Sequence, residues 1–171
     1  MSNIILIGMP AAGKSTVGIL LAKRLGMGFM DTDVTLQAET GKKLSEIISE
    51  KGMDAFLRIE SAHVSGLSCT HHIIATGGSV VYSDAAMTHL KSDGFVIHLS
   101  ITRSALHRRI GDIERRGVVI TPGLTIDALY QQRAPLYKRY ADITVDCSSG
   151  TADQVTETLI HMLPYSFPTN R

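Results

Sequence analysis

The chain has 171 residues, which is enough for one domain with a substantial core and too few for two. Its 17 basic and 16 acidic residues give a net charge of +1, which argues against nucleic acid as a partner. The sequence has no apolar run that could cross a membrane, no basic signal-peptide segment and two isolated cysteines, Cys69 and Cys147. We therefore expect a cytoplasmic monomer without membrane partners, and we assign no role to either cysteine.

The first predicted element is an apolar strand that leads into a phosphate-binding loop. Residues 8–16 follow the pattern G-x-x-x-x-G-K-[ST] and lie between the strand Asn3–Ile7 and a helix predicted over Ser15–Leu25. The glycines let backbone N–H groups point at a phosphate, the lysine reaches the β- and γ-phosphates, and the serine hydroxyl binds Mg²⁺. The residues predicted to bind nucleotide are Gly8, Ala11, Ala12, Gly13, Lys14, Ser15 and Thr16.

Strand-like and helix-like runs alternate along the rest of the chain. Further strands are predicted near Gly28–Met30 and at His72–Ala75, Phe95–Leu99 and Ile143–Val145. Further helices are predicted at Lys43–Lys51, Asp54–Ser68, Asp84–Lys91, Arg103–Ile110, Ile126–Tyr140 and Thr151–Met162, with Thr102 and Thr151 as N-caps. This alternation indicates a three-layer α/β domain, in which helices cover both faces of a five-stranded parallel sheet.

The other motifs narrow the class of phosphate-loop protein. The Asn-Lys-x-Asp guanine reader of GTP switches is absent, and the later apolar strands end without the acidic residue of motor and transport ATPases. A small chain of this kind is interpreted as a small-molecule kinase. A nucleotide-binding regulatory module that does not turn over is the alternative, and an acceptor site would separate the two.

Polar groups that suit an acceptor site follow two of the strands. Asp31 and Asp33 come after the second strand, at the sheet edge that faces the ligand crevice in open parallel sheets. One carboxylate can hold Mg²⁺, and the other can accept the proton of an attacking hydroxyl. Gly77 and Gly78 follow the third strand and allow close approach of a ligand. A helix N-cap pair and an ordinary turn are the structural alternatives.

Two basic features come later in the chain. The segment from Arg108 to Val119 is rich in arginine, has glycines at 111 and 117, and suits a lid that excludes water from phosphoryl transfer. Arg133 lies in the string Gln-Arg-Ala-Pro-Leu-Tyr and can form a two-pronged bond with a substrate carboxylate. A solvated basic loop and a helix-surface salt bridge are the respective alternatives.

The order of these motifs, together with the string Phe56…Glu60, resembles the shikimate kinase family. The resemblance covers residues 1–147 and implies a nucleoside-monophosphate-kinase-like fold, ATP, Mg²⁺ and phosphoryl transfer to a hydroxyl of shikimate. It implies one kinase domain over 1–171, with a substrate-binding segment at about 33–62 and a lid at about 111–123. The implied roles are catalysis by Lys14, Asp33 and Arg116, Mg²⁺ binding by Ser15 and Asp31, adenine stacking by Arg109, and substrate binding by Asp33, Leu57, Arg58, Gly77, Gly78, Ser79 and Arg133.

Several positions depart from the pattern of that family, mostly around the acceptor. Leu57 stands where the family has an arginine on the substrate carboxylate, and Arg58 next to it points about 100° away along a helix. Met53 replaces a glutamate, Ser79 a third glycine, and Gly117 the proline after the lid arginine. The resemblance makes shikimate the expected acceptor. Because of these departures, another small hydroxylated acid or polyol, such as gluconate, is the alternative.

Overall fold

Five parallel strands form the single sheet of a computed structural model that describes residues 2–110, 124–164 and 167. Strand β1 (Asn3–Ile7) lies at the centre, between β3 (His72–Ala75) and β4 (Gly94–Ser100). Strands β2 (Gly28–Asp31) and β5 (Ile143–Asp146) form the two edges. The predicted α/β class and five-stranded parallel sheet are confirmed.

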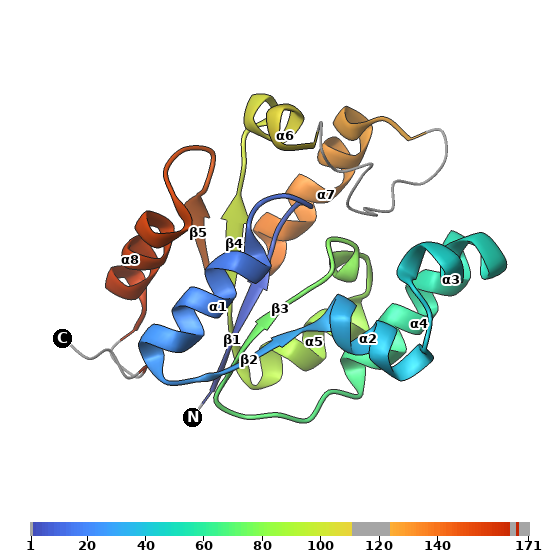
Figure 1. The fold of residues 1–171 in the computed structure, drawn as a ribbon, viewed down its shortest axis with the longest axis horizontal. Coiled ribbons are helices and arrows are strands. Elements are labelled where there is room, and N and C mark those ends of the chain that lie inside the picture. The colour runs from blue at the N-terminus through green and yellow to red at the C-terminus, as the bar shows by residue number, and fades with distance from the viewer. Residues whose placement is uncertain (1, 111–123, 165–166, 168–171) are drawn as a thin grey trace.

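Helices cover both faces of this sheet (Figure 1). Helices α1 (Lys14–Leu25) and α8 (Ala152–Met162) lie on one face, and α5 (Asp84–Ser92) and α7 (Ile126–Tyr140) lie on the other. The remaining elements are α2 (Thr32–Thr40), α3 (Leu44–Lys51), α4 (Met53–Ser65), the 3₁₀ turn η1 (Val80–Tyr82) and α6 (Arg103–Ile110). Strand β1 is buried along its whole length because both faces and both edges of it are covered.

Helices α2, α3 and α4 gather beyond the β2 edge and have a small core of their own (Figure 1). Leu36, Ile47 and Phe56 form this core, separate from the main core around the sheet. Helix α2 was not predicted from the sequence because only Thr32 and Leu36 of its nine residues are buried, so its apolar periodicity is weak. Its N-cap is Asp31, whose Oδ1 accepts hydrogen bonds from the backbone N–H groups of Asp33 and Val34 at 3.0 and 3.4 Å.

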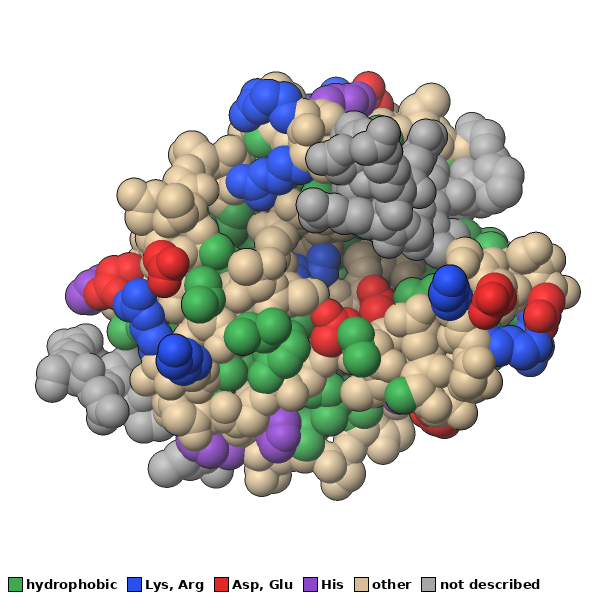
Figure 2. Space-filling view, viewed as in Figure 1, with side chains coloured by type: hydrophobic (Ala, Val, Ile, Leu, Met, Phe, Trp, Pro, Cys, Tyr) green, Lys and Arg blue, Asp and Glu red, His purple; other side chains and the backbone are tan. Residues whose placement is uncertain are grey.

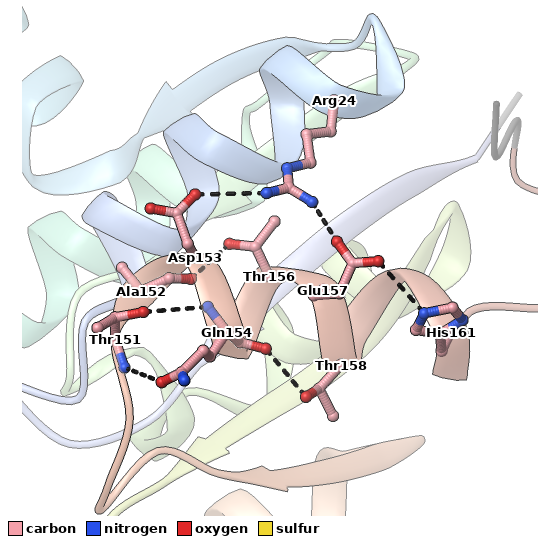
Figure 3. Close-up of polar contacts among 9 residues, drawn as sticks. All are labelled: Arg24, Thr151, Ala152, Asp153, Gln154, Thr156, Glu157, Thr158 and His161. Carbon is pink, nitrogen blue, oxygen red and sulfur yellow. Dashed lines mark hydrogen bonds and ion pairs between the residues drawn. The ribbon is translucent and has the colours of Figure 1, made fainter. Parts of the chain in front are cut away.

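Helix α8 packs against α1, and polar contacts form at its start and across the two helices (Figure 3). Thr151 forms the predicted N-cap, and its side chain and that of Gln154 form a capping box. Arg24 from α1 makes ion pairs with Glu157 and, at 3.4 Å, with Asp153 of α8. Both pairs are exposed, so they add little to the stability of the fold.

The lid predicted at about 111–123, with Arg116 and Gly117, lies outside the described residues. Within the described residues, none of the helices is both long enough and apolar enough to cross a membrane.

Candidate active site

The carboxyl ends of β1, β2 and β3 bring the predicted site residues together. The phosphate loop follows β1, Asp31 ends β2, and Gly77 follows β3, so neighbouring strands deliver all three to one edge of the sheet. Figure 2 shows a hollow near the middle of the face of the molecule in view, with acidic and basic side chains close to it.

The phosphate loop has the backbone geometry that its glycines predict. Gly8 has φ +149°, and a side chain there would collide with the carbonyl oxygen of Leu99. Gly13 has φ +99° and caps the N-terminus of α1, which begins at Lys14. The ammonium of Lys14 donates to the carbonyls of Gly8 and Met9 at 2.8 and 3.0 Å. The lysine is therefore folded over the loop at the positive end of α1, where a phosphate would bind.

The charge of Lys14 is held in a buried setting. Burial lowers the pKa of Lys14 from 10.5 to about 8, and the nearby carboxylates of Asp33 and Asp31 oppose that shift. Because water solvates this ammonium poorly, an anionic ligand at the loop would be strongly attracted to it.

Ser15 and Asp31 meet as the predicted Mg²⁺ ligands should. The Ser15 hydroxyl donates to Asp31 Oδ2 at 2.6 Å, while Asp31 Oδ1 caps α2. One hydroxyl and one carboxylate beside a phosphate site fit Mg²⁺, which takes few protein ligands and completes its shell with phosphate and water. The N-cap alternative for Asp31 is confirmed, and because the cap uses Oδ1, it leaves Oδ2 on the side of Ser15.

Gly77 and Gly78 lie between three of the charged residues of the candidate site. A side chain at position 77 would collide with Glu60 Oε1 and would lie 2.6 Å from Asp33 Oδ1. A side chain at position 78 would lie 2.9 Å from Arg133 Nη1 and 3.1 Å from Pro10. The absence of side chains at both glycines lets Asp33, Glu60 and Arg133 come to one place beside the phosphate loop.

Arg133 is buried rather than on the helix surface, with only 6% of the residue exposed. Its Nε donates to the Tyr82 hydroxyl at 3.2 Å, and its guanidinium lies over the Tyr82 ring. Tyr137, one turn further along α7, donates from its hydroxyl to the carbonyl of Gly78 at 2.7 Å. Among the described residues, no carboxylate lies within 4.0 Å of the Arg133 guanidinium. The alternative of a salt bridge on the helix surface is therefore wrong for this part of the chain.

Arg109 lies on the other side of the phosphate loop, at the end of α6. Its guanidinium donates to the carbonyls of Ala11 and Cys147 at 3.2 and 2.6 Å. Cys147 itself is buried, and burial raises the pKa of its thiol to about 11. Burial also raises the pKa of Cys69. Both thiols are therefore held protonated, which argues against a reactive role for either cysteine.

Glu60 is a site residue that the sequence did not assign by itself. It is 3% exposed and accepts a hydrogen bond from the Ser79 hydroxyl at 2.9 Å. Burial raises its pKa from 4.5 to about 7; Asp33 adds to the rise, whereas the Ser79 hydrogen bond, Arg133 and Lys14 oppose it. Thr32 was also missed, although its Oγ1 accepts from the N–H of Gly77 at 3.0 Å and so ties β2 to the glycine pair.

The raised pKa of Glu60 predicts a loss of stability as the pH rises. The folded state holds this proton more tightly than the unfolded state, so the stabilisation is complete below pH 4.5 and is lost as the pH rises through about 7. The free energy of unfolding should fall between pH 5 and pH 8 by roughly 1–3 kcal/mol more in the wild type than in Glu60→Gln. Urea unfolding of both proteins at the two pH values measures the difference. Equal pH dependence in the two proteins would contradict the prediction.

Comparisons with known proteins agree with this geometry. The family model described as shikimate kinase matches residues 10–164. The chain belongs to the shikimate kinase family. A shikimate kinase from Thermodesulfovibrio yellowstonii is 37% identical over 163 residues, which cover 94% of each chain. One from Thiobacillus denitrificans is 38% identical over 160 residues, which cover 92% of this chain and 87% of that protein.

The fold agrees with a solved shikimate kinase structure as well. The structure of the shikimate kinase from Acinetobacter baumannii in complex with shikimate superimposes with a TM-score of 0.85 at 30% identity. The superposition covers 95% of this chain and 92% of that one. The family predicted from the order of motifs is thus confirmed.

Two departures from the shikimate kinase pattern meet in the structure. Leu57 lines a cavity of about 380 Å³ between α4 and η1, together with Arg58, Glu60, Ser79 and Tyr82. Glu60 therefore has a leucine one turn before it in place of an arginine, and it takes a hydrogen bond from Ser79, where the family has glycine. Arg58 is exposed whereas Glu60 is buried, which agrees with the different directions expected from the helix, yet both reach the same cavity.

Proposed function

We propose that this protein transfers the γ-phosphoryl group of ATP to a hydroxyl of shikimate, as a cytoplasmic monomer with one kinase domain over residues 1–171. The observation that carries the proposal is the meeting of Asp33, Glu60 and Arg133 around Gly77 and Gly78, directly beside a phosphate loop. A regulatory nucleotide-binding module would have no use for a second set of charged groups at that place. Family membership supports the same acceptor.

The residues divide the reaction between them. The phosphate loop and Lys14 would hold the β- and γ-phosphates, with Arg109 beside the adenine. Mg²⁺, when bound by Ser15 and Asp31, offsets the charge of the phosphates. Asp33 would orient the acceptor hydroxyl and take its proton. Its Oδ1 lies 2.6 Å from the place that a Cβ at Gly77 would occupy, so the carboxylate faces the glycine pair.

The electrostatic setting suits Asp33 as a base. Burial raises the pKa of Asp33 above its usual value, and Lys14 opposes that rise. A carboxylate that holds a proton more strongly is a better acceptor for the proton of a hydroxyl, provided that it stays ionised until the acceptor binds. We infer that Lys14 keeps it ionised. Arg133 would grip the carboxylate of shikimate, and Arg116 of the lid at about 111–123 would close over the transferring group.

The acceptor is tested by a coupled assay of ADP release with shikimate, gluconate and a panel of polyols. We expect turnover with shikimate that exceeds turnover with the others. ADP release with gluconate or a polyol alone would keep the kinase proposal and replace the acceptor. ATP binding without ADP release on any acceptor would favour the regulatory module.

Leu57→Arg is expected to lower the KM for shikimate by about 10- to 100-fold, because a charge-assisted hydrogen bond to the carboxylate is restored. The new guanidinium would lie one helical turn from Glu60, which can orient it. The KM for ATP should stay unchanged. Leu57→Gln is the matched control, since it lengthens and polarises the side chain without a charge. A KM for shikimate that is equal in Leu57→Arg and Leu57→Gln would contradict the assigned place of the carboxylate.

A further inference from the structure

We propose that Tyr82 is a positioning residue, which fixes the guanidinium of Arg133 toward the acceptor carboxylate and so compensates in part for the arginine that this chain lacks at position 57. The proposal rests on the proposed function, because it takes Arg133 as the group that binds the acceptor. Tyr82 belongs to η1, directly after the glycine pair, and nothing in the motif pattern pointed to it.

The contacts of Tyr82 fix both its own hydroxyl and the arginine. The hydroxyl accepts a hydrogen bond from Arg133 Nε at 3.2 Å and donates one to Gln132 Oε1 at 3.2 Å. The guanidinium carbon of Arg133 lies 5.1 Å from the centre of the Tyr82 ring, within the range of a cation–π contact. Tyr82 therefore contacts two successive residues of α7 and holds Arg133 through its side-chain nitrogen nearest the chain.

The hydrogen bond from Arg133 Nε to the Tyr82 hydroxyl, the tether, leaves the other end of the guanidinium directed at the candidate acceptor site. Because Nε is engaged by Tyr82, the edge formed by Nη1 and Nη2 is the one available for a two-pronged bond with a carboxylate. Nη1 lies 2.9 Å from the place that a side chain at Gly78 would occupy, so this edge faces the glycine pair and the phosphate loop. Tyr82 and Leu57 also line the same cavity, which places the tether on the wall where the second arginine is missing.

Tyr82 is not needed to fill the core. It is 39% exposed, whereas its neighbours Val80 and Val81 are each 1% exposed and anchor η1. A tyrosine at an exposed position whose hydroxyl binds a buried arginine acts mainly through that arginine. An arginine held in one rotamer loses less conformational freedom when the carboxylate binds, so its grip is stronger than that of an untethered arginine.

The test compares the shikimate KM of the wild type with those of Tyr82→Phe and Tyr82→Leu. Loss of the hydroxyl alone should raise it about 3- to 10-fold, and loss of the ring as well about 10- to 50-fold. The KM for ATP should stay within about 2-fold of wild type. Tyr130→Phe is the matched control, because Tyr130 lies on α7 beneath a different arginine, Arg103. It should leave all constants unchanged.

A second comparison separates a positioning role from a structural one. In an Arg133→Lys background Tyr82→Phe should have no further effect on kcat/KM for shikimate, because the tethered group is already gone. An unchanged KM in both Tyr82 variants, an equal rise in the KM for ATP, or the same effect in the Arg133→Lys background would overturn the proposal. If the wild type does not phosphorylate shikimate, the proposed function fails first, whereas shikimate turnover with an unaffected Tyr82→Phe refutes the tether alone.

Discussion

Replacing Lys14 with methionine is expected to lower kcat by about 10²-fold or more, because one preorganised charge facing the phosphates is lost. The ammonium is anchored by the carbonyls of Gly8 and Met9, so its position is set before any nucleotide binds. Methionine keeps most of the length of the side chain and removes only the charge. Steady-state kinetics with saturating ATP and acceptor measure the change.

The fold should survive this substitution. Burial disfavours the charged form of Lys14, as the lowered pKa shows, and methionine carries no such cost. A thermal midpoint close to that of the wild type is therefore expected, although two loop carbonyls lose their donor. Lys23→Met is the matched control, since Lys23 is exposed on the same helix. Near-normal turnover of Lys14→Met would remove the catalytic role of the phosphate loop.

The strands could be predicted closely from the sequence because a parallel sheet buries them on both faces. The runs at Asn3–Ile7 and His72–Ala75 are observed with those bounds, since a doubly covered strand is a continuous apolar run. Helix α2 and the turn η1 could not be predicted in this way. Helix α2 buries little, and η1 is only three residues long, so neither has a measurable apolar period.

Some residues of the candidate site could likewise be predicted from the sequence, and others could not. The phosphate loop and the Ser15–Asp31 pair follow from motifs, because each motif is short and its residues act through local geometry or a fixed strand order. The partners of Glu60 and Arg133 do not follow from any motif. Ser79 and Tyr82 approach them from η1 and the turn before it, and such meetings depend on how α4 and α7 pack around that turn.

In the candidate acceptor site, the departures from the family pattern at positions 57 and 79 are connected. Ser79 supplies Glu60 with a hydrogen bond, and Tyr82 holds Arg133. Leu57, Glu60, Ser79 and Tyr82 line one cavity. Burial raises the pKa of Glu60, and the hydrogen bond from Ser79 and the charge of Arg133 oppose that rise only in part. The sequence predicted that the changes at 57 and 79 both lie around the acceptor, but not that both residues line one cavity with Glu60.

Asp33→Asn is expected to lower kcat by about 10²- to 10⁴-fold with ATP affinity near that of the wild type, because the asparagine keeps the shape but cannot take a proton. Rapid-quench measurement of phosphoryl transfer, together with ATP binding by calorimetry, separates the two effects. Asp54→Asn, at an exposed position in the first turn of α4, is the matched control. Weakened ATP binding with turnover retained would instead assign Asp33 to the metal.

The companion variant Asp31→Asn distinguishes the two carboxylates. Asparagine caps helices as well as aspartate does, so α2 should keep its start while the Mg²⁺ ligand is weakened. The Mg²⁺ concentration needed for half-maximal activity should rise in Asp31→Asn and stay near that of the wild type in Asp33→Asn. The reverse pattern would exchange the roles of the two residues. The Ser15 hydroxyl donates its hydrogen bond to Asp31 rather than to Asp33, and this contact favours Asp31 as the metal ligand and leaves Asp33 for the acceptor hydroxyl.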